Sequence, residues 1–545
     1  MPEKNLALLT YGCQMNKYDS EKIAGILQKS GIRLTDDLDN ADIVILNTCS
    51  IREKAEQKVY SQIGRLTPLK KRNRKLIIGV GGCVAQIQGE KILQRAPHVD
   101  LVFGTLNIYK LPHLIREVEE KGERIADIDN DYSEDNDLAP IKREESIHAW
   151  LSIMHGCDNY CTYCVVPYTR GREKSRPKES ILSEIRGLAE EGFKEVTLLG
   201  QNVNSYGRDT GEDIDFPDLL SIIDRVKGIK RIRFITSHPK DLSDKLIKAM
   251  ADLPKVCEYL HLPIQAGSDR VLTNMNRGYT SGDYLKKIDR LKESIPEIAL
   301  STDIIVGFPG ETDGDFEKTR DIVKKVCYDG IYLFKYSPRK ETPAAIFSNQ
   351  LSDTVKQARF EEILKLQKEI TLNKNKELEG KVVEVLVEGE DKNANGKPGH
   401  DADGHDLNQR VGGHKQERGG RPGHAGGNKQ RAVSEPVLQP ASRHRHGSRR
   451  QGDNERQQSG PTGRVLQPYG IFQERDGIDL HGRHRGDDEH QRQQEQHVRA
   501  PAAPPAPGWR RRATSRAPRQ FLGERGRPRR PAAGAQAEDR PERAR

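Results

Sequence analysis

Two long stretches of this chain alternate short apolar runs with segments of helical periodicity, and this alternation restricts the fold more than any other feature. In the first stretch the apolar runs lie at 6–10, 41–46 and 75–80, with helical patterns at 21–29 and 53–65. The β-α-β-α-β order predicts a parallel sheet whose crossover connections are right-handed. The chain is therefore expected to begin with an α/β domain.

A second alternation of the same kind starts near residue 150. Helical patterns separate six expected strands, which lie at 150–155, 195–200, 231–236, 258–263, 300–306 and 331–336. Six strand–helix repeats predict a partial (β/α)6 barrel, in which the chemistry takes place at the C-terminal ends of the strands. The fold class expected is α/β, with a parallel-sheet domain followed by a partial barrel.

Composition divides the chain further. The two α/β regions are expected at 4–120 and 146–375, with a polar, acidic linker at 121–145 between them. A β-rich pattern begins within 376–390 and breaks off, which predicts an incomplete β-barrel remnant. Residues 391–545 are rich in Gly, Pro, Gln, His and Arg and have almost no apolar runs, so we expect a disordered tail.

The tail contains no lysine after Lys429, although the rest of the chain uses lysine freely. This change motivates the hypothesis that the tail is translated from a shifted reading frame that starts near residue 390. The alternative is a natural Arg-rich arm that binds RNA nonspecifically. The tail holds 31 Lys and Arg against 19 Asp and Glu, so the net charge of +9 comes from the tail and does not indicate nucleic-acid binding elsewhere.

The sequence argues against a membrane protein and against a secreted one. No run of about 18 apolar residues occurs, and the first ten residues lack the regions of a secretory signal. Eight cysteines among 545 residues are too few for a disulfide scaffold. They are better explained as metal ligands, catalytic groups or core residues in a reducing compartment, so a cytoplasmic protein is expected.

Cys157, Cys161 and Cys164 form a C-x3-C-x2-C motif directly after an expected strand. Thiolates are the standard ligands of iron–sulfur clusters, and three of them leave the fourth iron of a four-iron cluster open. An open iron can bind a small molecule and deliver an electron to it. Structural zinc uses four ligands, usually in two pairs, and a redox C-x-x-C pair would leave Cys157 unexplained. The motif therefore favours an iron–sulfur cluster.

Three further cysteines each follow an expected strand of the first region: Cys13, Cys49 and Cys83. Parallel strands place their carboxyl ends at one edge of a sheet, where open α/β sheets bind ligands. The three thiols are therefore expected to meet in space. Each one alone is also compatible with a small buried apolar residue, so a second metal site and core packing both remain open. Cys257 and Cys327 are expected to pack in the core.

These motifs resemble the methylthiotransferase family of radical S-adenosylmethionine (SAM) enzymes, most closely its MiaB-type tRNA-modifying members. The resemblance covers about residues 4–389. It rests on 11–16 (YGCQMN), 47–55 (NTCSIREKA), 82–86 (GCVAQ), 156–172 (GCDNYCTYCVVPYTRGR), 199–206 (LGQNVNSY), 261–265 (HLPIQ) and 301–311 (STDIIVGFPGE).

The resemblance implies two [4Fe-4S] clusters and SAM as cofactors. Cys157, Cys161 and Cys164 would hold the cluster that cleaves SAM, and Cys13, Cys49 and Cys83 would hold an auxiliary cluster. Tyr163 is expected near the adenine of SAM, and Gly200, Gln201 and Asn202 are expected to contact SAM or substrate. For these last four residues simpler roles stay open: packing for Tyr163, a tight turn at Gly200 and loop capping by the two amides.

The implied reaction adds a methylthio group to carbon 2 of N6-isopentenyladenosine at position 37 of tRNA, with two SAM molecules and two clusters. That C–H bond has no useful acidity, so radical chemistry explains why the enzyme needs SAM and a reducing cluster. The target base must also be splayed out of the tRNA loop. The stretches 47–55 and 169–172 favour this substrate over a threonylcarbamoyl-adenosine in tRNA or an aspartate on a ribosomal protein.

Two other classes of function are open to a chain of this kind. Three-cysteine clusters with a large substrate barrel fit a simple electron carrier poorly, and a noncatalytic RNA-binding protein would depend on the basic tail. The resemblance implies three partners: the isopentenylated tRNA, a sulfur donor, and an electron donor such as flavodoxin or ferredoxin. The enzyme itself is expected to be a monomer. The family's RNA-gripping β-barrel, called TRAM, would start within 376–390, and nothing after that segment matches it. This departure bears on tRNA affinity, because phosphate contacts supply much of such binding.

Overall fold

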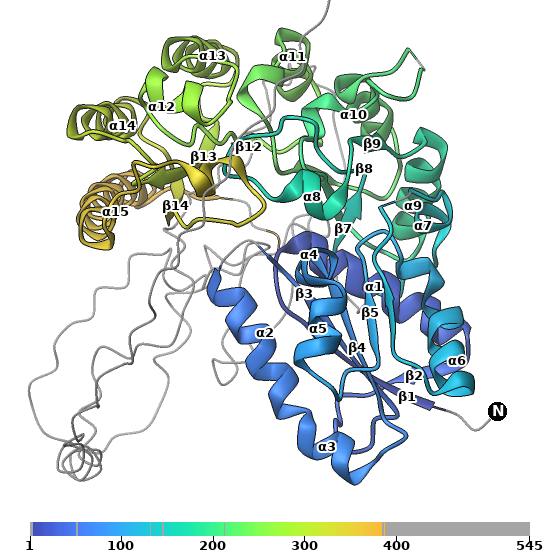
Figure 1. Ribbon diagram of the computed structural model, residues 1–545. Coiled ribbons are helices and arrows are strands. Elements are labelled where there is room, and N and C mark those ends of the chain that lie inside the picture. The colour runs from blue at the N-terminus through green and yellow to red at the C-terminus, as the bar shows by residue number, and fades with distance from the viewer. Residues whose placement is uncertain are drawn as a thin grey trace, which may run out of the picture. The chain divides into compact units, whose positions relative to one another are not determined.

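The computed structural model describes residues 4–50, 53–130, 132–143, 147–211, 213–383 and 386, with only the backbone described for 53–58. These residues form two α/β regions, drawn in blue and in green to yellow in Figure 1. The tail expected at 391–545 lies outside the described residues, and so does most of the expected TRAM start. Within 376–390 the described residues contain the end of the last helix and no strand.

The first region is built on a six-stranded, entirely parallel sheet with the order β2-β1-β3-β4-β5-β6. Its strands are β1 Lys4–Thr10, β2 Ile32–Leu34, β3 Ile43–Thr48, β4 Ile77–Gly82, β5 Leu101–Phe103 and β6 Ile125–Asp127. The three expected strands are β1, β3 and β4, so the predicted parallel α/β fold is confirmed. The sequence did not indicate β2, β5 and β6, because three residues are too few to show strand periodicity.

Helices cover both faces of this sheet, and β3 shows how the sequence fits that arrangement. Ile43 and Ile45 face one hydrophobic core, and Val44 and Leu46 face the other. A strand buried on both faces is apolar at every position, as a parallel sheet requires. The helices of this region are α1 Gln14–Lys29, α2 Glu53–Arg65, α3 Thr67–Arg72, α4 Cys83–Gln88, α5 Glu90–Arg95 and α6 Leu111–Lys121.

The segment expected to be a linker, 121–145, differs from that expectation. It contains the edge strand β6 and a short helix, α7 Asp135–Leu138. Two of its polar residues are buried, and Asn136 donates a hydrogen bond from Nδ2 to the carbonyl of Leu106 at 2.6 Å. Polar composition suggested solvated chain, but the Asn136 amide is hydrogen-bonded internally, and Asp137 Oδ1 lies 3.4 Å from His155 Nε2 and 3.5 Å from Arg176 Nε.

The second region contains six parallel strands in two groups of three, ordered β7-β10-β11 and β12-β13-β14. The strands are β7 His148–Ser152, β10 Glu195–Leu199, β11 Arg231–Phe234, β12 Tyr259–His261, β13 Ala299–Val306 and β14 Gly330–Lys335. They coincide with the six strands expected from the sequence. A short antiparallel pair, β8 Met154–His155 and β9 Lys174–Ser175, follows β7.

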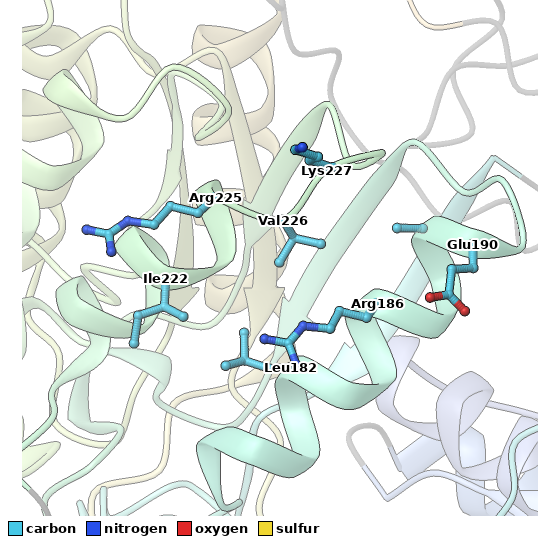
Figure 2. A pocket seen from close by; sticks show the side chains of 8 residues that line it. Leu182, Arg186, Glu190, Ile222, Arg225, Val226 and Lys227 are labelled. Carbon is cyan, nitrogen blue, oxygen red and sulfur yellow. The ribbon is translucent and has the colours of Figure 1, made fainter.

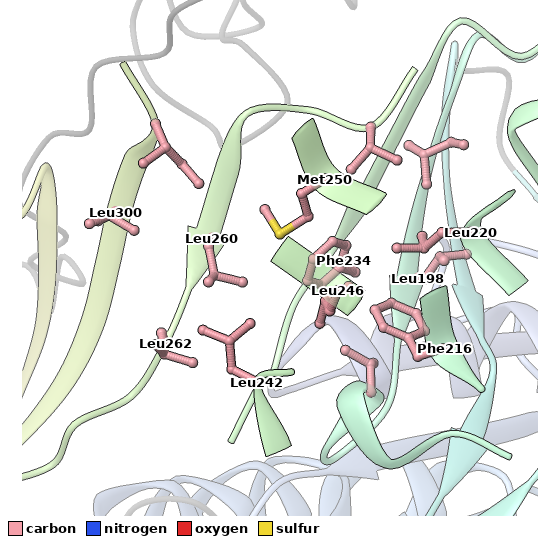
Figure 3. Packing of buried hydrophobic residues seen from close by; sticks show 14 of the residues in the cluster. Leu198, Phe216, Leu220, Phe234, Leu242, Leu246, Met250, Leu260, Leu262 and Leu300 are labelled. Carbon is pink, nitrogen blue, oxygen red and sulfur yellow. The ribbon is translucent and has the colours of Figure 1, made fainter. Parts of the chain in front are cut away.

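Helices line the outside of this partial barrel, and the core fills the space between them and the strands. Figure 3 shows Phe216 and Phe234 among the packed side chains, and their rings meet edge to face with centroids 5.0 Å apart. The helices are α8 Val166–Arg170, α9 Lys178–Glu190, α10 Phe216–Asp224, α11 Asp244–Asp252, α12 Asp269–Asn274, α13 Ser281–Ser294, α14 Asp313–Val326 and α15 Asp353–Lys376. In the described part of the chain, no helix combines the length and apolar character needed to cross a membrane.

Candidate functional site

Three thiols meet at the C-terminal edge of the first sheet, which we call the N-terminal thiol set: Cys13, Cys49 and Cys83. Cys13 caps the start of α1, Cys49 follows β3, and Cys83 begins α4 directly after β4. The side chains of Cys13 and Cys49 are hydrogen-bonded to each other. A β-carbon added to Gly12 would lie only 2.6 Å from the β-carbon of Cys49, so the loops after β1 and β3 are in close contact.

The acid–base properties of this set depend on a cation from the second region. The hydrogen bond with Cys49 lowers the pKa of Cys13 to about 6, against the effect of burial, and the Arg170 guanidinium lowers it further. Burial raises the pKa of Cys83, although the positive charge of Arg170 opposes that effect. A thiol that ionises near neutral pH beside a cation is suited to binding a metal.

Two asparagines connect the loops that carry these thiols, and the sequence did not single them out. Asn16 donates from Nδ2 to the side-chain oxygen of Asn47 at 3.2 Å and to the carbonyl of Thr48 at 3.1 Å. Asn47 donates in return to the backbone carbonyl of Asn16 at 2.8 Å. Both lie within the stretches 11–16 and 47–55, so their motif positions were the available signal.

The second trio, which we call the loop thiol set, is Cys157, Cys161 and Cys164, on the connection from β8 to α8. None of the three forms a disulfide. The Cys161 sulfur accepts a hydrogen bond from Arg277 Nη1 at 3.3 Å, and the Cys157 sulfur accepts one from Asn159 Nδ2 at 3.3 Å. Burial raises the pKa of Cys157 to about 11 and that of Cys164 to about 12. These thiols must therefore lose protons when a metal binds.

The loop thiol set is held from both ends. Gly156 has a φ of +71°, and a β-carbon there would lie 2.0 Å from the carbonyl oxygen of Arg172, so only glycine fits. On the other side Asn276 donates from Nδ2 to the carbonyls of Asn159 at 3.2 Å and Tyr160 at 3.1 Å. Asn276 and Arg277 follow α12, more than a hundred residues away along the chain, and sequence reasoning missed both.

Tyr163 lies inside the loop thiol set and is partly buried against the second half of the barrel. It packs near Met275 and Phe308, and its hydroxyl accepts a hydrogen bond from Arg277 Nη1 at 3.3 Å. Burial raises its pKa well above the usual value. Arg277 therefore contacts both Tyr163 and Cys161, which brings the expected adenine-contacting residue close to the loop thiol set.

Gly200, Gln201 and Asn202 follow β10, as expected, but their environments differ. A β-carbon on Gly200 would lie 2.5 Å from Met154 Cγ, so glycine is required by close packing. Asn202 is buried and its amide is engaged, with Nδ2 donating to Asp241 at 2.8 Å and Oδ1 accepting from the His238 backbone at 3.1 Å. The Gln201 side-chain oxygen is buried and has no hydrogen-bond partner.

Other buried polar atoms without hydrogen-bond partners lie in the loops after β10 and β11: both amide atoms of Asn204, Ser237 Oγ and His238 Nε2. His238 Nδ1 accepts from the Lys240 backbone at 3.3 Å, which assigns the ring proton to Nε2. Burial, followed by the nearby cation Arg277, lowers the pKa of His238 to about 2, so the ring is a neutral donor. Unsatisfied buried groups at strand ends are suited to binding a ligand.

The donor chemistry of the two thiol sets fits iron–sulfur clusters. The N-terminal thiol set lies at the C-terminal ends of three strands and the loop thiol set lies on one connection, and each set has a nearby arginine that offsets thiolate charge. Among the described residues, no three His, Cys, Asp or Glu side chains close around a single ion position. A cluster binds each thiolate to a different iron, so it tolerates wider spacing than a single ion does.

A cavity of about 510 Å³ lies elsewhere, between the outer helices α9 and α10 (Figure 2). Figure 2 shows Arg186, Arg225 and Lys227 at its wall. It contains neither a thiol nor a strand end, so the candidate site is the barrel mouth with its loop thiol set.

The expectation of core packing is wrong for Cys327, which is exposed. This residue ends α14 with a φ of +54°, and its thiol donates to the carbonyl of Lys324 at 3.0 Å. The helix stops one residue earlier than an amphipathic pattern suggests, and the left-handed cap turns the side chain outward. Cys257 is partly exposed.

Two protein families match separate parts of this chain. The uncharacterized protein family UPF0004 matches residues 5–104, and the Radical SAM superfamily matches residues 151–323.

Several relatives are named tRNA-2-methylthio-N(6)-dimethylallyladenosine synthase. The protein from Thermoanaerobacter sp. (strain X514) is 52% identical over 382 residues, which cover 70% of this chain and 81% of that protein. The one from Carboxydothermus hydrogenoformans is 50% identical over 394 residues, which cover 72% and 90%. Among solved structures, the radical SAM methyltransferase TsrM from Kitasatospora setae has a TM-score of 0.48 at 15% identity, over 63% of this chain and 77% of that chain.

Proposed function

This chain belongs to the family of radical SAM enzymes named tRNA-2-methylthio-N6-dimethylallyladenosine synthases, and from this premise we propose that it adds a methylthio group to carbon 2 of N6-isopentenyladenosine at position 37 of tRNA. The family resemblance expected from the sequence motifs is confirmed. The names of the relatives favour this substrate over a threonylcarbamoyl-adenosine or a ribosomal aspartate.

The observation that supports the proposal best is the presence of two thiol sets, one at the C-terminal ends of the parallel strands β1, β3 and β4 and the other on the connection from β8 to α8. Cys157, Cys161 and Cys164 would hold the cluster that binds SAM. The N-terminal thiol set would hold the second cluster. When bound, the two clusters and SAM supply the electron, the carbon radical and the methylated sulfur that this aromatic C–H bond requires.

The chain's own residues orient the loop thiol set and provide donors that can bind the adenine base. Arg277 donates to Cys161 and to Tyr163, so it fixes the loop thiol set against the aromatic ring beside it. Carbon 2 of adenine lies between N1 and N3, and both nitrogens accept hydrogen bonds. The neutral His238 Nε2–H and the Asn204 amide are buried donors in the loops after β10 and β11, and they are suited to bind such acceptors.

The partners are part of the same proposal. A flavodoxin or ferredoxin would supply electrons, a separate donor would supply sulfur, and the enzyme would act as a cytoplasmic monomer. Gly200, Gln201 and Asn202 would shape the SAM side of the mouth, with the Gln201 oxygen available to a ligand.

The proposal is tested by anaerobic reconstitution of the chain with iron and sulfide, followed by incubation with SAM, a reductant and isopentenylated tRNA. Mass spectrometry of the nucleosides is expected to detect the 2-methylthio product, together with 5′-deoxyadenosine. Cys161→Ala is expected to abolish both products. Reaction of threonylcarbamoylated tRNA instead, or activity retained in the Cys161 variant, would contradict the proposal.

A further inference from the structure

Arg170 belongs to the second region by sequence but contacts the N-terminal thiol set. It ends α8, six residues after Cys164. Its Nη2 donates to the carboxylate of Asp19 on α1 at 2.7 Å, and its charge acts on the thiol of Cys83. Helix α8 lies against α4, the helix that begins with Cys83 (Figure 1). The segment that follows the loop thiol set thus supplies a cation to the other set.

This arginine is buried among charges. The Arg170 side chain is 5% exposed and the Asp19 side chain is 4% exposed. Burying a guanidinium is costly unless its charge and its five N–H donors find partners. Asp19 supplies one negative charge, and the thiols of Cys83 and Cys13 are the other groups whose ionised forms favour the charged guanidinium. The pair is therefore placed to act on the electrostatics of the thiols.

The backbone around Arg170 is also fixed to the first region. Thr105 Oγ1 donates to the carbonyl of Thr169 at 2.6 Å, and both residues are buried. The Thr105 backbone is in turn held by Gln86, whose Oε1 accepts its N–H at 3.0 Å. Gln86 lies on α4, three residues after Cys83. The position of Arg170 relative to the thiols is thus determined by contacts on two sides.

We propose that Arg170 is a positioning residue for the cluster of the N-terminal thiol set, which is complete only when α8 packs against α4. Its buried guanidinium lies near the thiols and offsets thiolate charge, so it raises the reduction potential of that cluster and strengthens iron binding. Hydrogen bonds to sulfur and the local charge are known determinants of cluster potential. The inference rests on the proposed function, because it assumes that these thiols hold a cluster.

The test uses the full chain with Cys157→Ala, Cys161→Ala and Cys164→Ala, so that only the N-terminal thiol set can bind iron. Iron and sulfide per chain, the rate of iron loss to a chelator and the midpoint potential by EPR titration are measured without any turnover. Arg170→Gln is expected to shift the potential to more negative values and to weaken iron retention about 10-fold or more. The potential and the iron retention of Arg170→Lys are expected to lie between those of Arg170→Gln and those of the parent chain.

Two further variants separate electrostatics from loss of structure. Arg172→Gln is the matched control, because Arg172 is 81% exposed, pairs with Asp158 and is expected to leave the potential unchanged. Asp19→Asn removes the negative charge beside Arg170 and is expected to move the potential in the positive direction, opposite to Arg170→Gln. General damage to the fold would not give opposite signs.

An unchanged potential and unchanged iron retention in Arg170→Gln would overturn the inference. If Arg170→Gln does not fold, the midpoint potential of Asp19→Asn provides the test. An unchanged potential, or a shift to more negative values, in Asp19→Asn would overturn the inference. Absence of iron from the parent chain with its N-terminal thiol set intact would instead contradict the cluster assignment in the proposed function.

Discussion

At the scale of single residues, the two thiol sets have different surroundings. The N-terminal thiol set has Arg170 next to Cys83 and Cys13, whereas the loop thiol set has Arg277 next to Cys161. The first set lies at the end of a sheet in one region and the second at the mouth of the barrel in the other. Their contributions to catalysis are therefore separable by single substitutions.

Cys13→Ala is expected to spare reductive SAM cleavage and to block methylthiolation, because it removes a ligand from the N-terminal thiol set only. Production of 5′-deoxyadenosine and of the modified nucleoside is measured in the same anaerobic assay. Cys257→Ala is the control, since Cys257 belongs to neither set, and it is expected to behave like the parent. Formation of modified nucleoside by the Cys13 variant would refute the assignment of these thiols.

At the scale of elements, the N-terminus of α14 shows how side chains fix a helix directly after the barrel stretch 301–311. Asp315 accepts hydrogen bonds from Ser268 at 2.5 Å, from the Thr312 hydroxyl at 2.6 Å and from the Arg270 side chain. Thr312 caps the helix and forms a capping box with Asp315. Burial raises the pKa of this carboxyl, but the hydrogen bonds from Arg270, Ser268 and Thr312 hold it well below its usual range.

Asp315→Asn is expected to lower the free energy of unfolding by about 1–3 kcal/mol at pH 7, since it removes charge-assisted hydrogen bonds. Because the folded pKa lies below the unfolded value, this stabilisation is complete above about pH 4 and is lost as the pH falls through the folded pKa. The difference from wild type should therefore shrink toward pH 3. Urea unfolding of metal-free protein at several pH values measures it.

Asp321→Asn is the control for that substitution, because Asp321 lies on the exposed face of the same helix. It is expected to change the stability by no more than about 0.5 kcal/mol. A stability difference for Asp315→Asn that stays constant down to pH 3 would show that its ionisation is not responsible.

At the scale of the whole molecule, a buried polar network joins the first region to the barrel. Arg176 is 1% exposed on its side chain. Its Nη1 donates to Tyr18 on α1 at 3.1 Å, to the carbonyl of Ser152 at 2.6 Å and to Glu184 on α9 at 2.9 Å. Lys22 on α1 adds a contact to the carbonyl of Asn136 at 2.6 Å. These contacts hold the two regions together on the side of α1.

Arg176→Leu is expected to destabilise the protein by about 3–5 kcal/mol, because it leaves the buried Glu184 carboxylate with one partner fewer. Tyr18→Phe removes one hydroxyl from the same network and is expected to cost only about 1 kcal/mol. Urea unfolding of the two variants provides the comparison. Equal stability of Arg176→Leu and wild type would mean that the network contributes no net stability.

The sequence by itself determined the longer strands and the positions of the thiols along the chain. A strand that is covered on both faces is apolar along its length. This pattern predicted buried parallel strands at residues 6–10, 41–46 and 75–80. Cys13, Cys49 and Cys83 follow those strands directly, so the direction of the strands alone placed them at one edge. The loop thiols were evident from their spacing, since three ligands on one short loop need no tertiary information.

Only the tertiary structure decided which distant side chains surround those thiols. Arg277 reaches Cys161 across 116 residues of sequence, and Arg170 reaches Asp19 across 151. Likewise the unpaired amide of Asn204 and the His238 ring nitrogen become evident only when the surrounding hydrogen bonds are known. Local periodicity encodes burial along one element, whereas partners of buried polar groups depend on how elements pack. Which residues surround the thiols was therefore decided by the packing of the elements and could not be predicted from the sequence.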